Sequence, residues 1–177
     1  MIRFMRDPNR PGNHPYCLSG LRELCGYLLF EDCCGAMYEI GSFAGESAAE
    51  FAKVFDVVNC VDPWGPSTWP QFKDGEIEES FNEVADLAGN IVKHKGTSLE
   101  VASRVADFSM DFVYLDGPHR IEEVDKQLAA WYSKVKQGAF IGGHDYDRWD
   151  VAYSVDTILG KNRVKLFPDQ SWVVRKI

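Results

Sequence analysis

A strand, a glycine turn and the start of a helix follow one another within ten residues, and this combination constrains the fold most. Residues 38–47 read YEIGSFAGES, where an apolar run ends at two glycines in the spacing E-x-G-x-x-x-G-x-S. A helical pattern from Ala48 to Phe55 follows at once. In a parallel sheet such a turn lies at the carboxyl edge, where backbone amides and a helix N-terminus bind nucleotide-like ligands.

The spacing of these glycines differs from the dinucleotide-binding fingerprint G-x-G-x-x-G. Glu39 precedes Gly41 by two residues. A carboxylate there would repel a pyrophosphate and favours a ligand that carries positive charge. A nicotinamide-dependent oxidoreductase therefore fits the turn less well than a different nucleoside-binding protein.

Composition narrows the range of partners. The chain has 177 residues, a formal net charge of −8 and a pI of about 5.0, without a cluster of Lys and Arg. Nucleic acid is therefore not expected as a partner. No apolar run is long enough to cross a bilayer, so no membrane partner is expected. The five cysteines include no C-x-x-C pair, which favours free thiols and a cytoplasmic location.

Strand and helix patterns alternate along the chain. We expect strands at 36–40, 57–61, 90–95, 111–115 and 139–141, and helices at 46–55, 76–87, 98–105, 121–135 and 149–159. This alternation predicts an α/β fold with a parallel sheet and helices on both faces. Two closing strands at 164–167 and 172–174 have only a short link, so they must pair antiparallel.

The whole chain, residues 1–177, is predicted to be one domain. It would consist of an irregular arm at 1–17, an N-terminal helix at 18–30 and a core at 36–177. The N-terminal helix is apolar on one side. It would suit a homodimer surface, and it would equally well cap the sheet.

Polar and titratable residues follow the ends of the predicted parallel strands. The strand ends carry Glu39, Asp62, Ser98, Asp116 and His144, one at or just after the end of each strand in turn. Ligands of such sheets bind beyond the carboxyl ends of the strands, so these residues are expected to gather at one site. Asp62 follows the second strand, where a carboxylate can accept hydrogen bonds from ribose hydroxyls.

Together these motifs resemble those of the class I S-adenosylmethionine-dependent methyltransferases. The resemblance covers about residues 36–177 and is strongest to small metal-dependent O-methyltransferases, the catechol, macrocin and cephalosporin-hydroxylase-like group. It rests on the glycine turn, on Asp62, on FVYLDGPH at 112–119 and on GGHDY at 142–146. It implies a Rossmann-like, doubly wound, seven-stranded sheet of order 3-2-1-4-5-7-6 with strand 7 antiparallel.

The resemblance also implies roles for individual residues. The residues expected to hold S-adenosylmethionine are Glu39, Gly41, Ser42, Gly45, Ser47, Asp62 and Ser98. The fourth-strand acid, Asp116, would serve catalysis by binding a metal, together with Asp145 and His144. His119 would be the base that deprotonates the acceptor.

The donor set gives the metal expectation a chemical reason. Two carboxylates with waters suit Mg²⁺, whereas an imidazole favours Mn²⁺ or another transition metal. Such a cation lowers the pKa of a bound hydroxyl. A histidine three residues after Asp116 has an ordinary pKa near 6.5, which suits a general base at neutral pH.

The leading hypothesis is therefore an enzyme, an S-adenosylmethionine-dependent methyltransferase that O-methylates a small hydroxylated molecule with the help of Mg²⁺ or Mn²⁺. The alternative is a non-catalytic subunit that binds S-adenosylmethionine or a similar nucleoside, because little chain is left for an acceptor-binding insertion. Trp64, Trp69 and Phe72 follow Asp62, and they could cover the adenosine or simply pack the loop onto the sheet.

Overall fold

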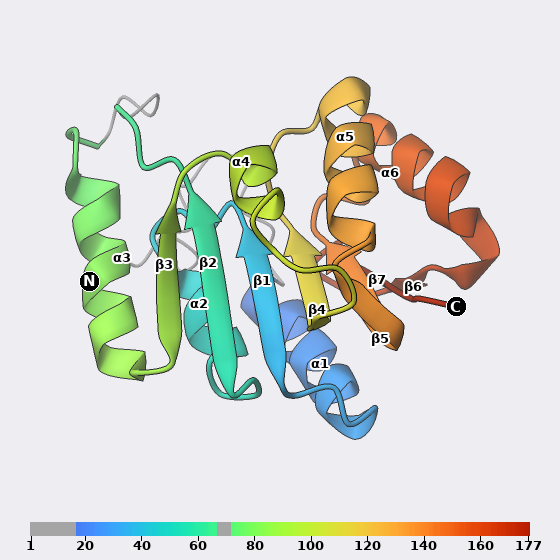
Figure 1. Cartoon of the computed structure of the whole chain (residues 1–177), viewed down its shortest axis with the longest axis horizontal. Coiled ribbons are helices and arrows are strands. Elements are labelled where there is room, and N and C mark those ends of the chain that lie inside the picture. Colours follow the sequence, from blue (N-terminus) through green and yellow to red (C-terminus); the bar gives the residue numbers. More distant parts are fainter. Residues whose placement is uncertain (1–16, 67–71) are drawn as a thin grey trace.

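A seven-stranded sheet forms the centre of the computed structural model, which describes residues 17–66 and 72–177 (Figure 1). The strands are β1 (Ala36–Ile40), β2 (Val57–Asp62), β3 (Ile91–Lys95), β4 (Met110–Leu115), β5 (Val135–Gly143), β6 (Lys165–Leu166) and β7 (Trp172–Arg175). Their order in the sheet is β3-β2-β1-β4-β5-β7-β6. Strands β1 to β5 are parallel, and β7 is antiparallel to both of its neighbours. The predicted fold class is confirmed.

Helices cover both faces of the sheet. They are α1 (Cys17–Phe30), α2 (Glu46–Phe51), α3 (Glu76–Ala88), α4 (Ser98–Ala102), α5 (Ile121–Tyr132) and α6 (Trp149–Val155). Figure 1 shows α1 and α2 behind the central strands and α4 and α5 in front of them. Two apolar cores result, one under α1, α2 and α3 and the other under α4, α5 and α6.

The register of the central strands brings their carboxyl ends to one edge. Ile40 at the end of β1 lies beside Val61 on one side and Leu115 on the other. Leu115 in turn lies beside Gly143 at the end of β5. The loops that follow β1, β2, β4 and β5 therefore meet at the same edge, with β1 in the middle.

The helix predicted at 121–135 is too long, because Val135 begins β5. Val124, Leu128 and Trp131 continue to Val135 at helical spacing. In the structure α5 ends at Tyr132, and β5 runs for nine residues from Val135 rather than over 139–141. Val135 is fully buried, so its apolar character reflects burial in the sheet.

The helix predicted at 149–159 changes its winding partway along. The α-helix ends at Val155, and residues Asp156–Gly160 form a π-helical turn. The hydroxyl of Tyr146 donates to Asp156 Oδ1 over 2.5 Å at this junction. A single π turn inside a helix is often found next to a functional site.

No helix in the described part of the chain is long and apolar enough to span a bilayer. Most of the predicted arm and Trp69 lie outside the described residues. Cys25, Cys33, Cys34 and Cys60 are free thiols.

Candidate functional site

A cavity of about 880 Å³ lies at the carboxyl edge of the sheet. One end is lined by the turn after β1, the end of β2 and the start of α4. The other end is lined by the loops after β4 and β5 and by α5. The volume lies towards the upper end of the usual range for small-molecule sites, about 300–1,000 Å³. The cavity is therefore large enough to be a small-molecule binding site.

Gly41 allows the turn after β1 to pass close to the end of β4. Its φ is +91°, and a Cβ atom here would lie 1.9 Å from the carbonyl oxygen of Asp116. The Gly41 amide donates to Val61 O over 2.8 Å, and the Asp116 amide donates to Ile40 O over 2.8 Å. These bonds fix the glycine turn and Asp116 relative to each other, and both line the cavity.

Asp62 is held at the same end by two backbone amides. Its Oδ2 accepts from the Phe43 amide over 3.0 Å, and its Oδ1 accepts from the Trp64 amide over 2.9 Å. Burial raises the pKa of Asp62, although these two hydrogen bonds oppose the change. Within residues 17–66 and 72–177 each carboxylate oxygen accepts one of these two hydrogen bonds, so Asp62 has the capacity to accept further hydrogen bonds from a ligand in the cavity.

Three of the predicted cofactor residues lie behind the cavity wall. Glu39, Ser42 and Gly45 do not line the cavity. The Ser42 hydroxyl donates to Glu39 O, and Gly45 packs against α3 through Val84 and Phe81. The other four, Gly41, Ser47, Asp62 and Ser98, do line it.

Glu39 is completely buried and only partly hydrogen-bonded. Its Oε2 accepts from the Cys60 thiol over 3.5 Å, whereas Oε1 has no hydrogen-bond partner in the described residues. Burial raises the pKa of Glu39 to about 7, against the opposing effect of the Ser47 and Ser42 hydroxyls. A buried carboxylate oxygen without a partner is costly unless a ligand supplies a donor.

Asp116, His144 and Asp145 converge at the other end of the cavity. Each offers one ligand atom, and these atoms lie within 4.8 Å of one another. The three side chains are half-buried, and all line the cavity. The sequence prediction that these three residues meet is therefore in agreement with the geometry. Two carboxylates and an imidazole form a donor set that suits a divalent cation.

His119 lies against this group rather than apart from it. Its Nε2 is 2.6 Å from Asp145 Oδ2, and His144 Nδ1 is 3.4 Å from Asp145 Oδ1. Asp145 thus lies between two histidines. Although burial raises the pKa of Asp145, the hydrogen bonds from His119 and His144 outweigh it and leave that pKa well below its usual range.

The carboxylates of Asp145 and Asp116 raise the pKa of His144. Burial disfavours its charged form, but the Asp145 hydrogen bond and the nearby Asp116 charge outweigh burial and raise the pKa of His144 to about 9. His144 is therefore protonated at neutral pH without a ligand. A metal ion would have to replace that proton, because an imidazole binds metals in its neutral form.

Several cavity residues were not predicted from the sequence. Tyr114 and Asp169 line the wall near Asp116, and Lys126 and Arg148 line it on α5 and before α6. A lysine on a helix surface and an aspartate in a hairpin turn carry no distinguishing pattern. Only the fold brings them to the cavity.

The loop after Asp62 packs onto the sheet through Trp64. This side chain is 7% exposed, its ring lies 4.5 Å from that of Phe81, and its Nε1 donates to Phe43 O. Phe72 is in edge contact with Phe43, which itself lines the cavity. Of the two expectations for these aromatics, packing therefore describes Trp64.

Comparisons with known proteins agree with this architecture. Residues 38–146 match the family model of a methyltransferase domain. No curated protein matches the sequence. Among solved structures, an O-methyltransferase from Bacillus cereus in complex with SAH has a TM-score of 0.67 at 16% identity, over 94% of this chain and 84% of that one.

Two further structures share the fold. A methyltransferase from Geobacter sulfurreducens has a TM-score of 0.63 at 14% identity, over 94% of this chain and 90% of that one. CalS11, a TDP-rhamnose 3'-O-methyltransferase of calicheamicin biosynthesis, has a TM-score of 0.69 at 16% identity, over 92% of this chain and 81% of that one. At these identities the likeness establishes the fold.

Proposed function

This chain belongs to the methyltransferase domain family, and from that membership we propose that it is an S-adenosylmethionine-dependent O-methyltransferase for a small hydroxylated molecule. The Bacillus cereus and CalS11 structures, both O-methyltransferases, support the choice of oxygen as the acceptor atom. The complex of the Bacillus cereus protein with SAH (S-adenosylhomocysteine, the demethylated cofactor) supports the choice of methyl donor.

The single observation that carries this proposal is the continuous cavity between two chemically different ends. Asp62 and the glycine turn at one end suit the ribose and the amino-acid part of the cofactor. Asp116, His144, Asp145 and His119 at the other end suit a hydroxyl group that must lose a proton. A methyl group that leaves the first molecule would therefore face the second.

We propose that Asp116, Asp145 and His144 hold a divalent cation, Mg²⁺ or Mn²⁺. The donor set fits, because all three ligand atoms lie within 4.8 Å of one another. Such a cation supplies Lewis acidity, which lowers the pKa of an acceptor hydroxyl and orients its oxygen.

We propose that His119 receives the acceptor proton. Asp145 Oδ2 holds the Nε2 side of the ring at 2.6 Å and stabilises the imidazolium that forms. Asp62 and the glycine turn would hold and orient the cofactor, whose sulfonium would supply an electrophilic methyl group to the acceptor oxygen. Alignment of the two molecules is then the main task of the protein's own residues.

The test is acceptor-dependent formation of SAH from methyl-labelled S-adenosylmethionine, with Mg²⁺ or Mn²⁺, across a panel of catechols, sugars and other small alcohols. We expect label in the acceptor from the wild-type protein. The double variant Asp116→Ala with Asp145→Ala should lose turnover by at least about 10³-fold and keep its affinity for SAH. The Asp107→Ala variant is a matched control, because Asp107 is exposed and pairs with Lys134 away from the cavity.

Survival of turnover in the double variant would disprove the roles of the metal and of the acidic pair. Binding of SAH without methyl transfer to any acceptor would instead favour the non-catalytic subunit. Selective binding of NAD over SAH would exclude both the methyltransferase and the non-catalytic subunit that binds S-adenosylmethionine.

A further inference from the structure

Two basic side chains line the cavity, Lys126 on α5 and Arg148 just before α6. Among residues 17–66 and 72–177 no other Lys or Arg lines it. Within the same residues neither side chain forms a hydrogen bond or an ion pair. The roles described above use neither of them, so their charges are available to a ligand in the cavity.

The lack of a partner distinguishes Lys126 from other lysines of this acidic chain. The net charge is −8, and Lys93 and Lys134, for example, both pair with carboxylates. Glu122 and Glu123 precede Lys126 by four and three residues on α5. This spacing favours an ion pair along a helix, yet Lys126 forms none with a described residue. Its ammonium group therefore remains open to an anion from outside the chain.

A tight turn holds Arg148 close to Asp145. The Arg148 amide donates to Asp145 O over 2.9 Å, so residues 145–148 form a β-turn whose end Cα atoms lie within about 7 Å of each other. The Tyr146 hydroxyl donates to Asp156 Oδ1 over 2.5 Å and ties this turn to the far end of α6. A ligand group at Arg148 would therefore be a short distance from a group at Asp145.

The two cations lie nearer to solvent than the proposed metal ligands do. Helices α5 and α6 pack side by side over the second apolar core (Figure 1). Lys126 and Arg148 are exposed, whereas the three proposed metal ligands are half-buried. Both cations also line the cavity, so they lie at its mouth and the proposed metal ligands lie further inside.

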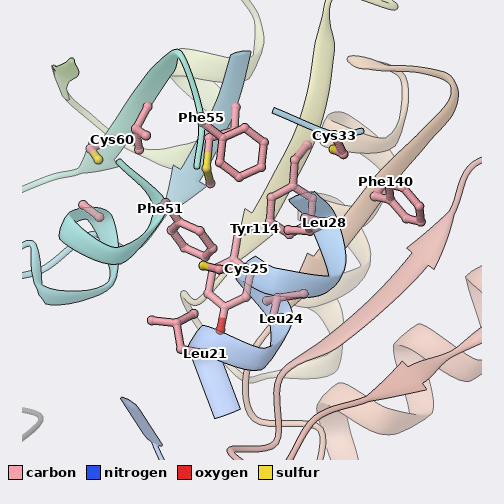
Figure 2. Packing of buried hydrophobic residues seen from close by; sticks show 14 of the residues in the cluster. Leu21, Leu24, Cys25, Leu28, Cys33, Phe51, Phe55, Cys60, Tyr114 and Phe140 are labelled. Atoms are coloured by element: carbon pink, nitrogen blue, oxygen red, sulfur yellow. The ribbon is translucent and has the colours of Figure 1, made fainter. Parts of the chain in front are cut away.

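The inner wall of the cavity disfavours an anion. Asp116, Asp145 and Asp169 line this wall, and Asp169 is only 1% exposed. Leu21 and Tyr114 line it on the side of α1, and Figure 2 shows the Tyr114 hydroxyl oxygen towards Leu21. A cation bound by the first two aspartates would leave the charge of Asp169 in place. An anionic ligand group is therefore attracted to the mouth of the cavity and repelled from its inner wall.

We infer that Lys126 and Arg148 bind an anionic group of the acceptor, a carboxylate or a phosphate, at the mouth of the cavity. The inference rests on the proposed function and extends it, because it makes the acceptor a hydroxylated acid. The anionic group stays partly in water, and the reacting hydroxyl points inward to Asp145 and His119. The planar guanidinium of Arg148 can hold two oxygens of either group, and Lys126 adds a second positive charge.

Calorimetry on the SAH-saturated protein with Mg²⁺ tests the inference with two matched pairs of probes. Dihydroxybenzoate and catechol differ by a carboxylate, and glycerol phosphate and glycerol differ by a phosphate. In at least one pair we expect the anionic probe to bind about tenfold more tightly than its neutral partner. The pair that shows this preference identifies the anionic group.

Variants that remove single charges connect the preference to the two residues. Lys126→Gln and Arg148→Gln should each weaken binding of the preferred anionic probe about threefold, and the double variant about tenfold, while the neutral partner is unaffected. Glu123→Gln should strengthen it, because Glu123 lines the cavity one turn before Lys126 and repels an anion. Arg104→Gln is the matched control, since Arg104 is exposed and does not line the cavity.

The inference would be overturned, and the proposed function left standing, if neither anionic probe binds more tightly than its neutral partner, or if the double variant keeps full affinity for the preferred probe. Thermal unfolding of each variant verifies that it is folded. Failure of the wild-type protein to bind SAH would instead overturn the proposed function, and the inference with it.

Discussion

Asp145 is the residue on which the proposed chemistry depends most. One of its oxygens contacts His119 at 2.6 Å and the other contacts His144 at 3.4 Å. A carboxylate that lies between two imidazoles can orient one of them as a base, while the other imidazole binds a cation. His119 and Asp145 are 26 residues apart in sequence, so only the fold reveals their contact.

Replacement of His119 tests its role as the base. His119→Gln should lower kcat by about 10²–10⁴-fold and leave the dissociation constant of SAH unchanged. Steady-state kinetics and calorimetry measure the two quantities. His94→Gln is the control, since His94 contacts Asn59 and does not line the cavity. A loss of kcat below about threefold would mean that another group takes the proton.

The raised pKa of Glu39 predicts that the protein loses stability as the pH rises. Its pKa rises from an ordinary value of 4.5 to about 7 on folding. The folded state therefore binds more protons than the unfolded state between these values, and stability falls as pH rises from about 4.5 to 7. Glu39→Gln removes this cost, so at pH 8 the variant should be more stable than the wild type by about 3 kcal/mol, and at pH 4 by much less.

Chemical denaturation at several pH values measures this difference. The pKa of Glu50 shifts in the opposite direction. Burial raises it, but the hydrogen bonds and charges of Arg22 and Lys53 outweigh burial, so the pKa of Glu50 is lowered on folding. Glu50→Gln should therefore destabilise the protein at pH 8. A stability gain for Glu39→Gln that does not vary with pH would contradict the assignment of the cost to ionisation.

At the scale of elements, the ends of β1 and β4 set the geometry of the site. The sequence predicts both strands within one residue, because each is an apolar run that ends in a turn or an acid. Their pairing, with Glu39 beside Tyr114, follows from the fold and not from any local pattern. The same limit explains Val135, which continues the helical spacing of α5 in the sequence but is buried at the start of β5 in the structure.

The close approach at Gly41 should make this position intolerant of any side chain. Gly41→Ala places a methyl group against Asp116 O at a positive φ, and should destabilise the protein by about 2–4 kcal/mol. Gly26→Ala is the control of opposite sign, because Gly26 is exposed in α1 with nothing near its Cβ position. It should stabilise by about 0.5–1 kcal/mol. Equal effects of the two changes in thermal or chemical unfolding would contradict the packing described here.

At the scale of the whole molecule, one cavity joins residues from most of the sheet. The part of the cavity around the glycine turn and Asp62 was predictable, since these residues follow a recognisable spacing. Tyr114 and Asp169 were not, because a buried tyrosine in an apolar strand and an aspartate in a hairpin are common in structural roles. The cavity thus has one part that can be predicted from the sequence and a wall around Tyr114 and Asp169 that only the three-dimensional structure defines.

A ligand that fills this cavity should stabilise the folded chain. At a concentration 100 times its dissociation constant, SAH adds about 2.7 kcal/mol, which raises the Tm of a domain of this size by about 5–10 °C. A thermal scan with SAH and with NAD at equal concentrations measures the shift. An equal or larger shift with NAD would contradict the preference described above.

The most direct test of the central claim is calorimetric titration of SAH into the wild type, Asp62→Ala and Asp107→Ala. We predict micromolar binding to the wild type and to Asp107→Ala, and binding at least about tenfold weaker to Asp62→Ala, because the hydrogen bonds to the ribose are lost. Absence of binding to the wild type, or equal binding to Asp62→Ala, would contradict the claim that this cavity binds S-adenosylmethionine.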